Sequence, residues 1–213
     1  MSAEEREKRA AAEEAARLVE EGMTVGLGTG STVAFFLPAL AAQGLQIRCV
    51  ATSPQTEQRA SDLGLLVESF ENFDRLDIAI DGADQVDPAG WLVKGGGAAH
   101  TREKIVAAAA KRFVVIASSN KLVQTLAPPI PLELLAFGLP ATLRALGPVE
   151  LRDTHRSPDG GVIADYLGPI DDQIELAERL EATPGVVEHG LFPPELVSEI
   201  LVARGDEIER LRP

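Results

Sequence analysis

The chain has a single cysteine, so it cannot form an internal disulfide bond. This thiol, Cys49, lies in an apolar run at residues 47–51, which favours a buried structural residue over a nucleophile. The N-terminal residues are charged and lack the apolar segment of a signal peptide. These features predict a protein of the reducing cytoplasm.

Basic residues are also scarce, with 20 Lys and Arg against 33 Asp and Glu and a formal net charge of -13. A nucleic-acid-binding surface normally needs a basic patch, so we expect no nucleic-acid partner. No apolar run reaches the length of a membrane span, and we expect no membrane partner. The three histidines, His100, His155 and His189, are far apart and lack the spacing of a zinc site, so no metal is predicted.

Apolar residues make up 45% of the chain, which is ample for a core. Strand and helix patterns alternate through the first 117 residues. Helices are expected at 3–21, 33–43, 55–63 and about 98–111, and strands at 23–27, 45–51, 65–68, 76–80 and 113–117. This alternation predicts an α/β protein with a mostly parallel, doubly wound sheet.

The pattern changes near Ala127, where three prolines follow within four residues. Beyond them we expect an extended run at 132–137, helices at 140–146 and 171–181, and strands at 149–153, 162–166 and 186–188. This order is typical of a small α+β domain. Residues 196–203 are apolar and branched, and their periodicity leaves both strand and helix open.

Charged residues and glycines concentrate between Asp81 and Lys104. Asp81-Gly-Ala-Asp84 follows an apolar strand, and ligands bind at the carboxyl ends of strands in open α/β sheets. Lys94 then precedes three glycines, whose exposed N–H groups suit an oxyanion. Glu103 lies in the first turns of the next helix. Singly, these are common turn, loop and helix-start signals, but together they indicate a functional site.

A second candidate site is the glycine- and hydroxyl-rich turn at 28–32, which joins a strand to a helix N-terminus and is therefore suited to an anion. No lysine stands where a P-loop requires one, and Ser31 occupies the third glycine position of a dinucleotide fingerprint. A small phosphate ester is the better candidate. Lys121 also follows an apolar strand, where a surface lysine and a site lysine are equally plausible.

These segments resemble type A ribose-5-phosphate isomerases. The match rests on residues 26–32, 81–84, 94–99 and 101–105, with weaker matches at 119–121, 129–133, 184–187 and 190–192. The resemblance implies a Rossmann-like domain at 1–127 and 198–213, with a small α+β, ferredoxin-like domain at 128–197. It also implies a homodimer or homotetramer that interconverts D-ribose 5-phosphate and D-ribulose 5-phosphate without cofactors, through an enediol, in the non-oxidative pentose phosphate pathway.

The resemblance also implies residue roles. Glu103 would be the base, Asp81 and Asp84 would shuttle protons, and Lys94 with the glycine amides would stabilise the oxyanion. The residues it places around the sugar phosphate are Thr29, Gly30, Ser31, Thr32, Asp81, Gly82, Ala83, Asp84, Lys94, Gly95, Gly96, Gly97 and Lys121.

The sequence departs from the family at His100, where an apolar residue is usual, and in the segments 157–161 and 193–197. Two other functions remain to be weighed. A sugar-phosphate sensor would not need the full acid/base set, and such sensors often carry a basic DNA-binding segment, which is absent here. An amino-sugar phosphate isomerase or deaminase would need a catalytic histidine, and His100 is a candidate for that role.

Overall fold

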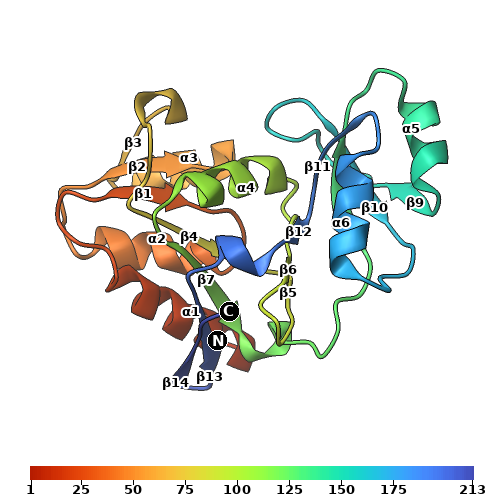
Figure 1. Cartoon of the computed structure of the whole chain (residues 1–213). Helices are drawn as coiled ribbons and strands as arrows, with labels where there is room; N and C mark the ends of the chain where they lie inside the picture. The colour runs from red at the N-terminus through yellow and green to blue at the C-terminus, as the bar shows by residue number, and fades with distance from the viewer.

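The computed structural model describes residues 1–213, and its largest unit is a seven-stranded sheet (Figure 1). The strand order is β14-β13-β7-β4-β1-β2-β3, with all pairs parallel except β13 and β14. The strands are β1 (Thr24–Leu27), β2 (Arg48–Ala51), β3 (Leu66–Val67), β4 (Ile78–Gly82), β7 (Phe113–Ser118), β13 (Glu199–Arg204) and β14 (Glu207–Leu211).

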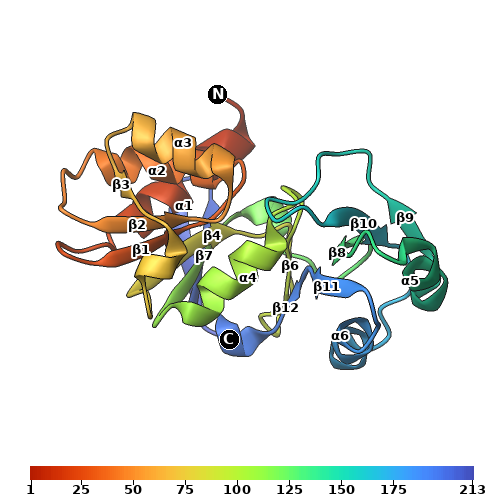
Figure 2. The ribbon, with the colours of Figure 1, turned by 90° about the horizontal axis from the view of Figure 1, so that it is seen from above.

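Helices cover both faces of this sheet (Figure 2). The helices α1 (Ala3–Ala16) and α2 (Val33–Ala41) share a core with Val114 and Ile116 of β7, and α3 (Pro54–Asp62) adds Ala60 to that core. The opposite face packs against α4 (His100–Ala109) and uses the alternate residues of β7, Phe113 and Val115. Because successive strand side chains point to opposite faces, one apolar strand supplies both cores.

A four-stranded antiparallel sheet with order β11-β8-β10-β9 forms a second unit. Its elements are β8 (Ile130–Leu134), α5 (Leu139–Leu146), β9 (Val149–Leu151), β10 (Val162–Tyr166), α6 (Gln173–Glu181) and β11 (Val186–His189). This β-α-β-β-α-β order is that of a ferredoxin-like unit. Between the two units in Figure 1 lies a small antiparallel sheet of β5 (Gln85–Val86), β6 (Leu92–Val93) and β12 (Leu191–Phe192).

Three short 3₁₀ turns complete the chain: η1 (Phe70–Asn72), η2 (Ser119–Lys121) and η3 (Pro194–Leu196). The predicted fold class, a mostly parallel Rossmann-like sheet with a smaller α+β unit, is confirmed. Several predicted segments differ in extent from the observed elements. The first helix ends at Ala16 instead of 21, and the strand expected at 132–137 begins at Ile130 and ends at Leu134.

Residues 199–203 of the ambiguous segment 196–203 lie in a strand, β13, which is followed by an unpredicted partner, β14. Residues 199–203 are all buried, and the side chains of β13 enter a core on each face of the sheet: Leu201 and Ala203 one core, Ile200 and Val202 the other. A strand covered on both faces has no alternation of apolar and polar residues, which is why its period was uninformative.

Candidate active site

The predicted site residues meet at the carboxyl ends of β1, β4 and β7, around a cavity of about 300 Å³. The cavity is lined by Thr29, Gly30, Ser31, Thr32, Gly82, Ala83, Asp84, Lys94, Gly95, Gly96, Gly97, Glu103 and Lys121. Every one of these residues belongs to the set expected from the sequence. Asp81 is the one expected residue that does not line the cavity, because its carboxylate lies beneath Lys94 and is 3% exposed.

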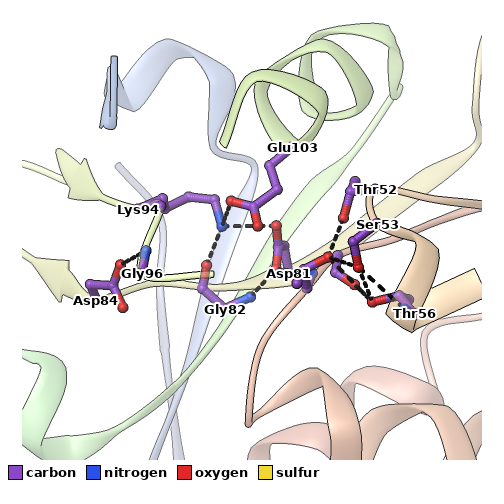
Figure 3. Close-up of polar contacts among 12 residues, drawn as sticks. Thr52, Ser53, Thr56, Asp81, Gly82, Asp84, Lys94, Gly96 and Glu103 are labelled. Carbon is purple, nitrogen blue, oxygen red and sulfur yellow. Dashed lines mark hydrogen bonds and ion pairs between the residues drawn. The ribbon is translucent and has the colours of Figure 1, made fainter. Parts of the chain in front are cut away.

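Three buried charged groups form the centre of the site (Figure 3). The ammonium of Lys94 donates to Asp81 Oδ2 at 2.8 Å and to the carbonyl of Gly82 at 2.6 Å. It also lies 3.1 Å from Glu103 Oε2. No side chain of the three is more than 4% exposed. The Lys94 ammonium therefore pairs with two carboxylates, those of Asp81 and Glu103, that are almost inaccessible to water.

Burial dominates the titration of this cluster. It raises the pKa of Glu103 to about 8, with a further rise from the charge of Asp81 that Lys94 only partly opposes. Burial also raises the pKa of Asp81, although Lys94 and two backbone N–H groups, from Gly82 and Thr29, favour its charged form. The Lys94 pKa is lowered by burial, but the two carboxylates outweigh that effect and raise it overall.

The glycine turn after β1 is shaped to receive Asp81. A Cβ atom on Gly28 would lie 2.0 Å from Asp81 Cγ, so only glycine allows this approach. The backbone N–H of Thr29 donates to Asp81 Oδ1 at 3.1 Å, and that of Gly82 donates to the same oxygen at 2.7 Å. The turn therefore holds the Asp81 carboxylate in place, while residues 29–32 of the same turn line the cavity.

The hydroxyl of Thr29 contacts a second hydroxyl-rich turn, whose residues Thr52, Ser53 and Thr56 are labelled in Figure 3. Its Oγ1 atom lies 2.8 Å from Thr52 Oγ1 and 2.8 Å from Ser53 Oγ. Thr56 Oγ1, at 3.2 Å, completes the group and also donates to the carbonyl of Gly28. Nothing in the sequence connects this second turn with the site, because the two turns meet only through the pairing of β1 and β2.

Residues 95–97, here called the glycine loop, form the opposite wall. Gly95 has φ of 111°, a conformation that favours glycine. The N–H of Gly96 donates to Asp84 Oδ2 at 2.8 Å, so Asp84 and the loop are held together (Figure 3). The N–H of Gly97 has no partner within the chain and is therefore free for a ligand.

Helix α4 carries Glu103 in its first turn, and neighbouring side chains attach this turn to the second sheet. Arg102 pairs with Asp159 at 2.7 Å. Lys104 pairs with Glu188 at 2.6 Å. The hydroxyl of Thr101 donates to Glu133 on β8. The position of Glu103 therefore depends on both sheets.

His100 is fully buried and lies outside the lining of the cavity. Neither of its ring nitrogens has a hydrogen-bond partner, and burial lowers its pKa to about 4. The ring is therefore neutral near pH 7. A catalytic histidine at this position, as an amino-sugar phosphate isomerase or deaminase would need, is not supported by this geometry.

No group of three or more His, Cys, Asp and Glu side chains is arranged to hold a metal ion. None of the helices has both the length and the apolar character needed to cross a bilayer.

Comparison with known proteins gives a consistent result over the whole chain. Residues 48–207 match the family model of ribose 5-phosphate isomerase A (phosphoriboisomerase A). A ribose-5-phosphate isomerase A from Rhodopseudomonas palustris (strain TIE-1) is 45% identical, with 99% of each chain covered. The one from Gluconobacter oxydans is 43% identical and covers 97% of this chain and 96% of its own.

Solved structures agree. Ribose 5 phosphate isomerase A from Neisseria gonorrhoeae has a TM-score of 0.94 and 34% identity, covering 99% of this chain and 97% of its own. A D-ribose-5-phosphate isomerase in complex with phospho-erythronic acid has a TM-score of 0.92 and 33% identity over 100% of both chains.

The fold, the buried acid–lysine cluster and these matches define an enzyme of the aldose–ketose isomerase class. More specifically, the chain belongs to the ribose 5-phosphate isomerase A family. Membership of this family supports the interconversion of ribose 5-phosphate and ribulose 5-phosphate.

Proposed function

We propose that the chain interconverts D-ribose 5-phosphate and D-ribulose 5-phosphate through an enediol intermediate, without a metal or organic cofactor, in the non-oxidative pentose phosphate pathway. The observation that carries this proposal is the buried Asp81–Lys94–Glu103 cluster beside a cavity that Glu103 and Lys94 both line. Such a cluster combines a proton acceptor with a fixed positive charge, which is what proton transfer next to a carbonyl requires.

Glu103 is the proposed base that removes the proton from C2 of the open-chain sugar and returns it to C1. A general base works best when its pKa lies near the operating pH. Burial, which raises the pKa of Glu103 to about 8, makes this carboxylate a stronger base than an exposed glutamate. Lys94, at 3.1 Å, keeps the charged form accessible.

Negative charge develops on the carbonyl oxygen as the enediol forms. The Lys94 ammonium and the N–H groups of the glycine loop are the proposed donors for that oxygen. Lys94 and the loop all line the cavity, and the Gly97 N–H is unpaired. Donors that are fixed before the reaction stabilise the charge without further reorganisation.

Asp81 and Asp84 are the proposed proton shuttles for ring opening and for the two oxygens. Asp84 lines the cavity and is placed to contact the sugar directly. Asp81 does not line it, and its Oδ2 accepts from Lys94 at 2.8 Å. Asp84 can therefore reach the substrate directly, whereas Asp81 lies behind the Lys94 ammonium.

The substrate phosphate needs local positive potential in a chain whose net charge is -13. The turn at 28–32 precedes α2, and Lys121 enters the cavity from η2. We assign residues 29–32 and Lys121 to substrate binding, because a helix N-terminus and a lysine both attract anions. The relative bound to phospho-erythronic acid supports a sugar-phosphate ligand for this fold.

The proposal includes the division into a Rossmann-like domain at 1–127 with 198–213 and a small α+β domain at 128–197. A separate hydrophobic core, formed mainly by residues of β8–β11, α5 and α6, supports this division. A cytoplasmic homodimer or homotetramer remains our expectation.

The deciding experiment is a coupled assay of metal-free protein with D-ribose 5-phosphate, with Glu103→Gln and Glu71→Gln assayed in parallel. Glu71 is exposed and does not line the cavity, so its variant controls for loss of one negative charge. We expect turnover by the wild type and by Glu71→Gln, and a loss on the order of 10²–10⁴ in kcat for Glu103→Gln. Binding without turnover by the wild type would instead indicate a sugar-phosphate sensor.

A further inference from the structure

Arg152, which directly follows β9, reaches from the second sheet to the glycine loop. Its side chain is held by Asp165 of β10: Nε donates to Oδ2 at 3.0 Å, and Nη2 donates to Oδ1. The remaining nitrogen, Nη1, donates to the carbonyl of Gly95 at 2.9 Å and more weakly to that of Gly96 at 3.4 Å. The guanidinium therefore bridges a fixed carboxylate and the backbone of the loop.

The peptide unit between Gly95 and Gly96 is restrained at both ends. In a trans peptide the carbonyl and the following N–H point in opposite directions. The Gly95 carbonyl accepts from Arg152, and the Gly96 N–H donates to Asp84 Oδ2 at 2.8 Å. The Gly95–Gly96 peptide plane therefore couples Arg152 to the carboxylate of Asp84, which lines the substrate cavity.

The same geometry governs the next peptide unit. The Gly96 carbonyl faces Arg152, so the Gly97 N–H points away from the guanidinium, and this N–H has no partner in the chain. Three successive glycines have little intrinsic preference for a single backbone conformation. The Ala98 N–H donates to the Gly95 carbonyl at 3.0 Å, and Arg152 and Asp84 add restraints from outside the loop.

Arginine is suited to this role in a way that lysine is not. The planar guanidinium can bond Asp165 with two nitrogens and still present a third to the loop. Arg152 does not line the cavity, so it acts on the substrate only through the loop and Asp84.

We propose that Arg152, fixed by Asp165, is a positioning residue that sets the glycine loop so that its amides and Asp84 face the substrate. This inference rests on the proposed isomerase function and assigns the second sheet a part in the active site. The loop amides would otherwise be free to turn away from the developing oxyanion.

The test is the kinetics of Arg152→Met with D-ribose 5-phosphate, and Arg156→Met is the matched control. Arg156 also donates to a glycine carbonyl, that of Gly160 at 3.3 Å, but it lies outside the cavity. For Arg152→Met we expect kcat to fall on the order of 10- to 100-fold, with a smaller change in KM, because displaced catalytic groups affect mainly the transition state. Arg156→Met should retain wild-type kcat.

Two further readouts separate positioning from a general loss of structure. Guanidinium chloride, at concentrations that leave the thermal transition unchanged, should partly restore kcat of Arg152→Ala, because truncation at Cβ leaves space for the ion beside Asp165. Calorimetric titration with phospho-erythronic acid should show weaker binding by Arg152→Met than by Arg156→Met. A kcat within twofold of wild type for folded Arg152→Met would overturn the proposal.

If Arg152→Met does not fold, Arg152→Lys becomes the decisive variant. It keeps the charge beside Asp165 but lacks the third nitrogen that reaches the loop, so kcat should still fall about tenfold or more. Full activity of Arg152→Lys would overturn the positioning role. A wild-type protein that neither turns over ribose 5-phosphate nor binds phospho-erythronic acid would instead contradict the proposed function itself.

Discussion

Lys94 and Asp81 form an ion pair that is almost completely removed from water: Nζ lies 2.8 Å from Oδ2, and the side chains are 2% and 4% exposed. A second carboxylate, Glu103, shares the same ammonium at 3.1 Å. The cluster holds one more acid than base, so at full ionisation it carries an uncompensated buried negative charge. This imbalance determines how the site responds to mutation and to pH.

Substituting Lys94 by methionine should abolish most activity and also destabilise the fold. The change leaves Asp81 and Glu103 buried without their cation, and breaking a buried pair in this way costs about 3–5 kcal/mol. Both carboxylates would then take up protons, so the variant should gain stability as pH falls from 7 toward 5. Thermal denaturation at several pH values, together with kcat/KM, measures both effects.

Lys111→Met is the matched control for that experiment. Lys111 pairs with Asp77 at 2.8 Å, but the two side chains are 60% and 30% exposed. Exposed pairs contribute about 0–1 kcal/mol, so this variant should stay close to the wild type in both measurements. Equal stability losses for the two lysine variants would contradict a buried Lys94 cluster.

The activity should rise with pH through the titration of Glu103. Burial raises the pKa of this carboxylate to about 8, and a general base acts only when deprotonated. The value of kcat/KM for the free enzyme should therefore increase from pH 6 and level off above the pKa. A profile that is flat between pH 6 and 9 would contradict the assignment of Glu103 as the base.

The same shift predicts a matching change in stability. The folded-state pKa of Glu103 lies above its unfolded value of 4.5, so the folded protein binds the extra proton more tightly. The stabilising contribution of this proton is fully present below about pH 4.5 and is lost as pH rises through about 8. Relative to Glu103→Gln, whose side chain stays neutral, the wild type should become progressively less stable over that interval in chemical denaturation.

Much of this arrangement could be predicted from the sequence, because the decisive residues follow apolar strands directly. Asp81 is the second-last residue of β4, Thr29 follows β1, and Lys121 lies just beyond β7. Parallel strands bring their carboxyl ends to one edge of a sheet, so the position of each residue along the chain already indicated that they would meet.

Other features depend on contacts between distant segments and have no local signal. Arg152 and Gly95 are 57 positions apart, and Thr29 meets Thr52 only because β1 and β2 are neighbours. The sequence did not predict whether residues 199–203 form a strand or a helix, because a strand buried on both faces lacks the alternation of apolar and polar residues that marks a half-exposed strand. Sequence patterns report which face of an element is buried, but not which partner covers it.

His100→Leu should stabilise the protein while leaving its activity intact. Both ring nitrogens are buried without a hydrogen-bond partner, and an unsatisfied buried polar group costs about 1–3 kcal/mol. Leucine has a similar volume and no polar atoms. Thermal denaturation at pH 7 should show the gain, and His155→Leu, at an exposed position, should show little change.

Acidification should increase the advantage of His100→Leu. Burial lowers the folded-state pKa of His100 from 6.5 to about 4, so the unfolded chain binds this proton more readily. The wild type should therefore lose stability relative to the variant as pH falls from about 6.5 toward 4. A large loss of kcat in His100→Leu would instead indicate that His100 takes part in catalysis, and it would favour an amino-sugar phosphate isomerase or deaminase.

Thr29 provides a test of the support beneath the phosphate turn. Its hydroxyl lies 2.8 Å from both Thr52 Oγ1 and Ser53 Oγ and so is turned away from the cavity. Thr29→Val keeps the shape of the side chain but leaves buried hydroxyls with fewer partners, which should lower stability by about 1–3 kcal/mol. Because the turn would then be less well fixed, we expect KM for D-ribose 5-phosphate to rise while kcat changes little.

Thr29→Ser separates the hydroxyl from the methyl group of the same residue. Serine retains the oxygen that contacts Thr52 and Ser53, so both stability and KM should stay near wild-type values. The methyl carbon Cγ2 would lie 3.2 Å from a Cβ built on Gly97, so it borders the glycine loop. If Thr29→Ser raised KM as much as Thr29→Val, the methyl contact with that loop would contribute to substrate affinity as much as the hydroxyl group beneath the turn does.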